Sequence, residues 1–219
     1  QEKKYTRAIA GRTLSVQLGK LAQQANGSCL VQYGETVVLV TAVMGANAKD
    51  VDYLPLSVDY EERYYAAGKI KESKWMKREG RPPEEAILTG RLIDRAIRPR
   101  FNHDMRNDIQ VVATVLSFDR ENDPDMVAMF GASLALLTSD IPWDGPIAGV
   151  RVSRGDVGMI AHPTYAQRAA GDFDIAIAGT KNRINMIEGG ARIVPEAHIS
   201  EAVAFGFQAM QELIAFQED

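Results

Sequence analysis

The sequence lacks several features that would assign it at once to a common class of protein. It has one cysteine, Cys29, in 219 residues, so no internal disulfide can form and a reducing, cytoplasmic location is expected. The longest apolar runs, such as 37–43, are far too short to span a membrane. The polar start Gln1-Glu2-Lys3-Lys4 does not predict a signal peptide. We therefore expect no membrane partner.

Signature motifs for nucleotide or metal chemistry are also missing. The sequence has no Walker loop, no dinucleotide-binding glycine pattern and no nucleophile elbow. Its histidines lack metal-ligand spacing and a cysteine partner: His103, His162 and His198. One stretch before a predicted helix is acidic: Asp119, Glu121, Asp123 and Asp125. It could hold a hard cation, but a solvated turn is the better interpretation. The sequence therefore predicts no metal site.

Charge is unevenly distributed along the chain. The net charge of −4 by itself argues against a nucleic-acid binder. The segment 69–100, however, holds ten Lys and Arg against five Asp and Glu, a net of +5, which leaves −9 on the rest. A basic segment on an acidic body produces a local field that attracts polyanions.

Hydrophobic periodicity predicts strands and helices that are mixed without a regular βαβ alternation. A hairpin turn is expected at Gly34-Glu35, and the strand 36–43 that follows it, apolar on both faces, is expected in mid-sheet and covered on both sides. We expect a single α+β domain over residues 1–219. The predicted strands cover 13–18, 29–33, 36–43, 54–60, 109–118, 147–153, 157–161, 173–178 and 184–188, and the predicted helices cover 83–98, 124–139 and 195–216.

The helix predicted over 83–98 carries a stripe of arginines. Arg91, Arg95 and Arg98 are spaced i, i+4 and i+7, so they share one face, and Arg81 enters just before the helix. Arginine suits bidentate phosphate contact, which favours phosphate binding over the alternative of a solvated face whose charge is offset by nearby acids. The opposite face should meet the core through Leu92, Ile93, Ala96 and Ile97.

Just upstream, "KWMKREGRPP" from Lys74 to Pro83 sets aromatic and basic residues side by side. Single-stranded nucleic acid is held by cations on its backbone and flat side chains on its bases. Trp75 and Met76 would contact bases, and Lys77 and Arg78 would supply charge. The alternative, in which Trp75 packs into the core, is disfavoured by its lysine neighbours.

These residues together resemble a known family. "GRLIDRAIRPRF" (Gly90–Phe101) and "REGRP" (Arg78–Pro82) are similar to the first RNase PH-like core of the bacterial polynucleotide phosphorylases (polyribonucleotide nucleotidyltransferases). So are "YGETVVLVTAV" (Tyr33–Val43), "PLSVDYEERYYAAGKI" (Pro55–Ile70) and "DFDIAIAGT" (Asp172–Thr180), in collinear order. The resemblance implies an α+β RNase PH-like core with the ribosomal protein S5 domain 2-like fold, built from mixed sheets and packed helices.

The resemblance also implies a function. The family degrades RNA from 3′ to 5′ by phosphorolysis, with Mg²⁺ and inorganic phosphate, and releases nucleoside diphosphates in mRNA turnover. Its members have two cores, a helical domain between them and C-terminal RNA-binding domains, form cytoplasmic homotrimeric rings and join ribonuclease or helicase partners in a degradosome. In the first core an aromatic and basic loop grips the single strand. Trp75-Met76-Lys77-Arg78 takes the place of the family's two Phe and two basic residues, and Arg91, Arg95 and Arg98 match arginines that face RNA or phosphate.

The catalytic pattern departs from the family's active cores. Those cores carry Asp, five residues, Asp, one residue and Lys, which place magnesium and phosphate. Here these positions are Arg168, Asp174 and Ala176, so we expect no catalysis and no metal in this core. The chemistry, with its Mg²⁺, would reside in a second core.

Two alternatives stay open at this point. One is a freestanding RNase PH-type exonuclease that trims tRNA 3′ ends, which the degenerate pattern disfavours. The other is a non-catalytic RNA-binding subunit of an exosome-like ring. A second core with an intact pattern, encoded downstream, would exclude both.

Overall fold

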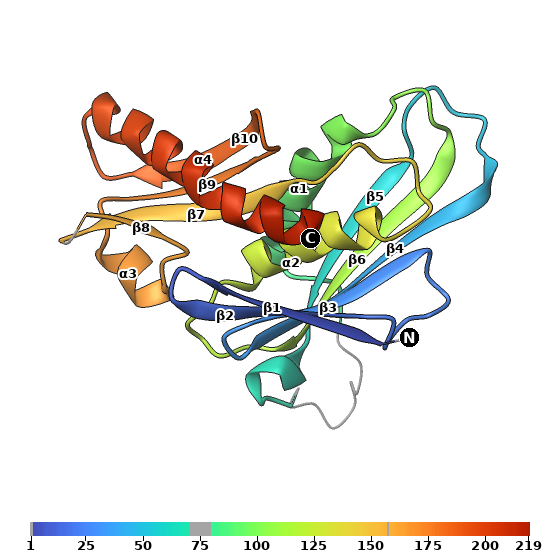
Figure 1. Ribbon diagram of the computed structural model, residues 1–219, viewed down its shortest axis with the longest axis horizontal. Coiled ribbons are helices and arrows are strands. Elements are labelled where there is room, and N and C mark those ends of the chain that lie inside the picture. Colours follow the sequence, from blue (N-terminus) through green and yellow to red (C-terminus); the bar gives the residue numbers. More distant parts are fainter. Residues whose placement is uncertain (1, 71–79, 157) are drawn as a thin grey trace.

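Two β-sheets with packed helices form the fold in the computed structural model, which describes residues 2–70, 80–156 and 158–219 (Figure 1). One sheet has the order β1-β2-β3-β4-β6-β5 and is antiparallel except for the parallel pair β5 and β6. Its strands are β1 (Lys3–Ile9), β2 (Arg12–Leu18), β3 (Gly27–Tyr33), β4 (Thr36–Ala48), β5 (Leu56–Glu62) and β6 (Asn107–Ser117). The other is antiparallel with the order β10-β9-β7-β8, formed by β7 (Ala148–Gly155), β8 (Gly158–Ala161), β9 (Phe173–Gly179) and β10 (Ile184–Ala191).

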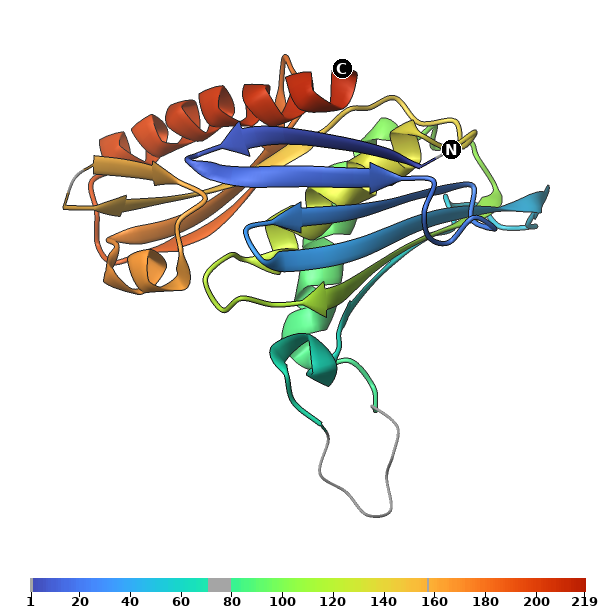
Figure 2. The same ribbon diagram turned by 60° about the horizontal axis from the view of Figure 1, so that its bottom comes forward.

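The hairpin of β3 and β4 forms at the predicted turn. Gly34 has a φ of 61°, the left-handed conformation that a type II′ turn requires at its first central position. β4 lies between β3 and β6, which confirms its place in mid-sheet. The predicted cover on both sides is wrong, because the helices pack on one face of this sheet (Figure 2). Val38 and Val40 are fully buried, whereas Val43 is 42% exposed.

Helix α2 (Pro124–Leu137) is the central element of the core. Residues 124–136 are all buried, because the helix packs against β3 and β4 of one sheet and β7 of the other. Glycines allow this close approach on both sides: a Cβ on Gly27 would lie 1.9 Å from the Ala135 carbonyl oxygen, and one on Gly149 would lie 2.3 Å from Met129 Sδ. Helix α2 is therefore held between the two sheets.

Helix α1 (Glu84–Ile97) presents the predicted apolar face to β5 and α2. Leu92, Ile93, Ala96 and Ile97 are buried, as expected from their spacing. Pro83 is the N-cap rather than the first helical residue, and the chain continues past Ile97 as the short 3₁₀ helix η2 (Arg98–Arg100), which contains Pro99. The C-terminal end of the helix, predicted at about Arg98, therefore lies within one residue of the observed end of α1 at Ile97.

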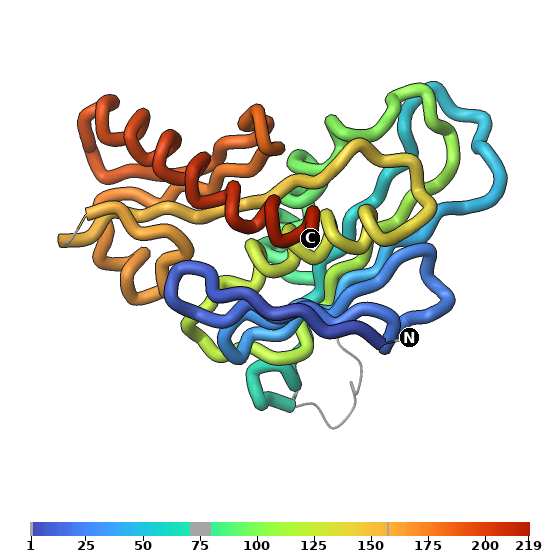
Figure 3. Tube along the Cα trace, viewed as in Figure 1, coloured from blue at the N-terminus to red at the C-terminus, as the bar shows by residue number. Residues whose placement is uncertain are grey.

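Helix α4 (Glu196–Glu218) covers the four-stranded sheet, where it packs on β7 and β9. The C-terminal end of the chain lies beside α2 (Figure 3). There Phe216 of α4 stacks on Phe130 of α2 with 6.0 Å between ring centroids. Besides η2, three elements were not predicted: β1, the 3₁₀ helix η1 (Tyr64–Ala67) and α3 (Tyr165–Ala170). Among the described residues, no helix is both long and apolar enough to cross a bilayer.

Candidate nucleic-acid interface and degenerate catalytic site

The aromatic and basic segment predicted to grip RNA falls outside the described residues. Trp75, Met76, Lys77 and Arg78 belong to residues 71–79, so their contact with RNA stays a prediction. The described chain on either side is close in space. The 3₁₀ helix η1 and the N-terminal end of α1 lie side by side at one end of the six-stranded sheet (Figure 2).

Arg98 holds helix α1 against strand β5. Its Nε and Nη2 donate to the two carboxylate oxygens of Asp94 at 2.9 and 2.7 Å. Its Nη1 and Nη2 donate to the carbonyl oxygens of Leu54 and Leu56 at 3.3 and 3.0 Å. A guanidinium has five N–H donors, and these contacts occupy four of them. One N–H group of Arg98 is therefore left to donate to a phosphate. The predicted contact of Arg98 with RNA stays a prediction.

The other arginines of the stripe are exposed. Arg95 pairs with Glu188 on β10, and both side chains are about half exposed. Arg91 and Arg81 have no ion-pair partner in the part of the chain that the structure describes. The stripe is thus divided: Arg98 is bound within the fold, Arg95 is in a weak surface pair, and Arg91 and Arg81 are open to an anion.

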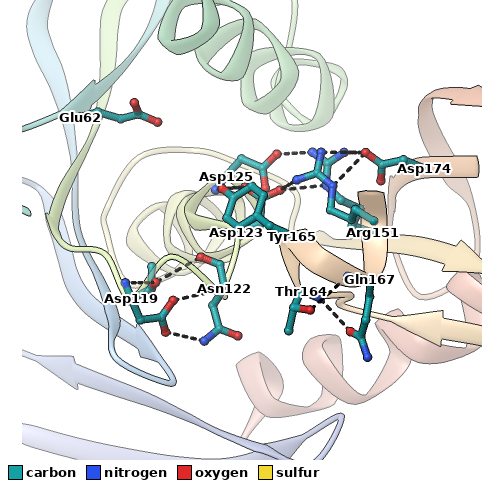
Figure 4. Close-up of polar contacts among 12 residues, drawn as sticks. Glu62, Asp119, Asn122, Asp123, Asp125, Arg151, Thr164, Tyr165, Gln167 and Asp174 are labelled. Carbon is teal, nitrogen blue, oxygen red and sulfur yellow. Dashed lines mark hydrogen bonds and ion pairs between the residues drawn. The ribbon is translucent and has the colours of Figure 1, made fainter. Parts of the chain in front are cut away.

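The degenerate catalytic positions lie at the N-terminus of α2, where the two sheets meet (Figure 4). Asp174 on β9 alternates with the buried Phe173 and Ile175, so its carboxylate points to the opposite side, as predicted. That side faces Asp123, the N-cap of α2, and Asp125 in its first turn. Ala176 is buried in the same strand, and Arg151 of β7 is its cross-strand partner.

Arg151 contacts all three of these aspartates. Its Nη1 lies 3.0 Å from Asp174 Oδ2, its Nε lies 3.1 Å from Asp123 Oδ2, and its Nη2 pairs with Asp125 Oδ2. The Nε contact is an ion pair without hydrogen-bond geometry, since this N–H has no hydrogen-bond acceptor. The Arg151 side chain is only 13% exposed. One guanidinium thus joins β7, β9 and α2.

Arg168 makes a second bridge between the same groups. Its Nη2 and Nε lie 2.7 and 3.0 Å from Asp174 Oδ2, and its Nη1 pairs with Asp123. The short helix α3 holds it there, because Thr164 and Gln167 form a complete capping box at the start of that helix (Figure 4). The resemblance predicts that Arg168 takes the place of the first catalytic aspartate, so positive charge would lie where the active pattern has a carboxylate.

Electrostatics explains why these charges can be buried together. Two guanidiniums face three carboxylates, so the cluster is nearly balanced. Burial, followed by the neighbouring Asp123 carboxylate, raises the pKa of Asp125 despite the opposing effect of Arg151. A protonated Asp125 would remove the remaining excess of negative charge. We call these five residues the arginine–aspartate cluster: Asp123, Asp125, Arg151, Arg168 and Asp174.

A divalent cation does not fit the arginine–aspartate cluster. The Asp174 Oδ2 and Asp123 Oδ2 atoms that would bind it are each in contact with both guanidiniums. An attacking phosphate would meet three carboxylates and no unpaired guanidinium. Among the described residues, no group of three or more His, Cys, Asp or Glu is arranged to hold a metal ion.

The acidic stretch before α2 divides into two parts. Asp119 fits the predicted turn: it accepts hydrogen bonds from the backbone N–H groups of Glu121 and Asn122, each at 2.8 Å. Partial burial works against ionisation, but hydrogen bonds led by those from Asn122 lower the pKa of Asp119 to about 2. For Asp123 and Asp125 the solvated-turn interpretation is wrong, because both are ion-paired in the arginine–aspartate cluster, where their side chains are only 14% and 9% exposed.

Sequence reasoning missed Arg151 as a site residue. A signal was present, since Arg151 interrupts an otherwise apolar run between the fully buried Val150 and Val152. A charged residue inside such a strand needs a buried partner. The sequence alone could not say that the partners are three aspartates from two other elements.

Comparisons with known proteins agree with this geometry. Residues 10–142 match the model of the 3′ exoribonuclease family, domain 1, and residues 145–209 match its domain 2. Three curated relatives carry the name polyribonucleotide nucleotidyltransferase. They come from Exiguobacterium sibiricum (52% identical, over 98% of this chain and 29% of the relative), Anoxybacillus flavithermus (55%, 96% and 30%) and Shouchella clausii (56%, 95% and 29%). The chain thus spans about 30% of the length of these relatives.

A solved structure establishes the fold independently. Rice (Oryza sativa) Rrp46 superposes with a TM-score of 0.74 over 99% of this chain and 93% of its own, at 11% sequence identity. The predicted α+β RNase PH-like fold is confirmed. The chain belongs to the 3′ exoribonuclease family, with an RNase PH-like core similar to that of the polyribonucleotide nucleotidyltransferases.

Proposed function

We propose that this chain is the N-terminal core of a polyribonucleotide nucleotidyltransferase, an enzyme that degrades RNA from 3′ to 5′ by phosphorolysis. Its own part is to bind and guide single-stranded RNA and to support ring assembly, without catalysis. Three relatives of this name, each matched over about 30% of its length, support the assignment. The observation that carries the silent role is the position of Arg168, whose guanidinium contacts the carboxylates of Asp174 and Asp123.

Catalysis would then reside in a second core outside this chain. Mg²⁺ and inorganic phosphate would act there, where a carboxylate pair and a lysine can stabilise the developing charge. We further propose a cytoplasmic homotrimer and ribonuclease or helicase partners in RNA turnover. In this chain the residues at the corresponding positions act as a structural ion-pair cluster that joins the two sheets to α2.

The isolated chain is expected to release no nucleoside diphosphate from RNA. The reason is that Asp123 Oδ2 and Asp174 Oδ2 each contact two guanidiniums, which a divalent cation would have to displace. The measurement incubates labelled oligoadenylate with the folded chain, Mg²⁺ and inorganic phosphate, and separates ADP by chromatography. ADP formation that rises with phosphate concentration would contradict the silent role and favour a freestanding RNase PH-type exonuclease.

The chain is expected to bind single-stranded RNA with a clear dependence on salt. Phosphate contacts by Lys69, Arg81 and Arg91 alone would give a slope of about −2 for log K against log salt. Contacts by Lys77 and Arg78 would make this slope steeper. Arg91→Ala should make it shallower by about 0.7, because one phosphate contact is lost.

Fluorescence anisotropy of a labelled oligoadenylate at several salt concentrations measures this slope. Lys4→Ala is the matched control, since Lys4 is an exposed cation on β1, remote in sequence from the basic segment. Binding that does not change with salt would contradict the proposed RNA contact. An equal effect of Arg91→Ala and Lys4→Ala would remove Arg91 from the interface.

A further inference from the structure

A cleft of about 470 Å³ lies between η1, the residues that precede α1, and the ends of β5 and β6. This volume is in the range of small-molecule sites and is large enough for one nucleotide. Acidic, basic and aromatic side chains all contribute to its wall. The lining residues that matter here are Tyr64, Lys69, Arg81, Phe118 and Tyr165.

The aromatic side of the cleft is held rigidly. Phe118 and Tyr165 form an edge-to-face pair with 5.9 Å between ring centroids and an interplanar angle of 89°. The Phe118 N–H donates to the Ala66 carbonyl oxygen at 2.9 Å, which fixes η1 to the end of β6. The Tyr165 hydroxyl donates to Asp123 Oδ1 at 3.3 Å, which ties the pair to the arginine–aspartate cluster. A flat ligand would therefore meet a preformed aromatic surface.

Tyr64 adds a further aromatic residue to the lining of the cleft. Its side chain is 46% exposed, although it stands on a helix whose backbone is well anchored. The Lys69 N–H donates to the Tyr64 carbonyl oxygen at 3.0 Å, and Gly68 closes η1 with a φ of 67°. A large exposed ring on a fixed turn is a suitable platform for a nucleobase.

Positive charge lies at the rim of the same cleft. Lys69 and Arg81 are exposed, and neither is ion-paired within the described part of the chain. The acids in the wall already have partners: Glu61 pairs with Arg63, and Glu62 Oε1 accepts the Tyr60 hydroxyl at 3.1 Å. The cleft thus combines aromatic rings with two cations that are open to a phosphate.

We propose that this cleft binds one nucleotide unit of single-stranded RNA. The base contacts Tyr64 and the Phe118–Tyr165 pair, and the phosphodiester contacts Lys69 and Arg81. This assignment rests on the proposed RNA-binding function and extends it. RNA would contact the cleft, which described residues form, in addition to the predicted RNA-binding residues 75–78. It also places bound RNA next to the arginine–aspartate cluster, where the strand would meet paired carboxylates instead of a catalytic centre.

Affinity measurements on matched tyrosine variants test the cleft. Anisotropy with labelled oligoadenylate compares the wild-type chain with Tyr64→Ala, Tyr64→Phe and Tyr53→Ala. Tyr53 is 62% exposed but does not line the cleft. Tyr64→Ala is expected to weaken binding about tenfold, a typical loss for one base stack. Tyr64→Phe and Tyr53→Ala should bind like the wild type, because the first keeps the ring and the second lies elsewhere.

Photo-crosslinking provides a readout that does not depend on affinity. An oligonucleotide that contains 4-thiouridine is irradiated with the wild-type chain, and the crosslinked peptides are identified by mass spectrometry. Crosslinks to Tyr64, Phe118 or Tyr165 would support the cleft. If the wild-type chain binds RNA but is crosslinked only at other residues, and Tyr64→Ala binds with unchanged affinity, the proposed nucleotide site in the cleft is wrong. The proposed function would then remain intact. No binding of oligoadenylate by the folded wild-type chain would instead overturn the proposed function.

Discussion

Replacing Arg151 by Met is expected to lower the free energy of unfolding by about 3–5 kcal/mol. The substitution keeps an apolar stem but removes the guanidinium that contacts Asp123, Asp125 and Asp174. Asp123 and Asp174 would keep only Arg168 as a cationic partner, and the buried Asp125 would have none among the described residues. A buried charge without a partner is far more costly than a missing surface pair. Urea unfolding at neutral pH, followed by circular dichroism, measures the loss.

Arg95→Met is the matched control for this effect. Arg95 is also ion-paired, with Glu188, but both side chains are about half exposed. An exposed pair contributes roughly 0–1 kcal/mol, so this variant should remain close to the wild type. Equal losses for Arg151→Met and Arg95→Met would show that the arginine–aspartate cluster has no special part in stability.

The pH dependence of Arg151→Met gives an independent check on the cause. Without the guanidinium, the folded-state pKa of Asp125, which burial already raises above the unfolded value, rises further. A carboxyl group with a raised folded-state pKa favours the folded state below its unfolded pKa, and this contribution is lost as pH rises through the folded pKa. The stability difference from wild type should therefore grow as pH rises above about 8, the folded-state pKa of Asp125 in the wild-type chain, and change little below it. A difference that is constant with pH would point to lost packing instead of unpaired charge.

A double variant separates the two causes more sharply. Asp125→Asn removes one of the carboxylates that Arg151 neutralises and keeps a side chain of similar size. In the Arg151→Met background this change should restore part of the lost stability, while in the wild type it should be destabilising. Such a change of sign is the signature of coupling between two residues in contact.

The parts of the fold that depend on local pattern could be predicted from the sequence. The helical spacing of Leu92, Ile93, Ala96 and Ile97 identifies the buried face of α1 because helix periodicity is a local property. The Gly34 turn is local in the same sense. By contrast, β1 was missed because five of its first six residues are exposed, so the strand carries no apolar alternation.

Sequence reasoning could identify site residues from their residue type and spacing, but not from partners that lie far away in the sequence. The departure from the active pattern of the family is predicted from Arg168, Asp174 and Ala176 in the sequence, and the loss of catalysis stays a prediction. The ion pairs of the arginine–aspartate cluster could not be predicted, because Arg151 reaches Asp125 across 26 positions and Arg168 reaches Asp123 across 45. The same limit applies to Arg98: helical spacing places it on the arginine stripe, but only tertiary structure shows that carbonyl oxygens of residues 54 and 56 accept its hydrogen bonds.

His162 is expected to make the chain less stable as the pH falls from 6.5 to 4. His162 is partly buried beside Tyr33, with 5.7 Å between ring centroids, and its Nε2 atom is buried without a hydrogen-bond partner among the described residues. Burial, and secondarily the positive charge of Arg12, lowers the pKa of His162 to about 4. Protonation in place would set an imidazolium next to a guanidinium that already donates to the His162 carbonyl oxygen.

The sign of the effect follows from linkage. In the unfolded chain His162 binds a proton near pH 6.5, whereas in the folded chain it does so only near pH 4. Between these values the unfolded state binds more protons, so the free energy of unfolding decreases as pH falls. The difference in pKa corresponds to about 3 kcal/mol over this range.

His162→Asn should remove this contribution, and it is a suitable substitution because His162 has a φ of 51°, a left-handed conformation that asparagine tolerates well. Urea unfolding at a series of pH values compares the slope of stability against pH in the two proteins. His103→Asn, at an exposed position, should leave the wild-type slope unchanged. Because the comparison uses slopes, a uniform loss of stability in His162→Asn does not affect it. Identical slopes for His162→Asn and wild type between pH 4 and 6.5 would show that His162 takes up its proton in the folded chain as easily as in the unfolded one.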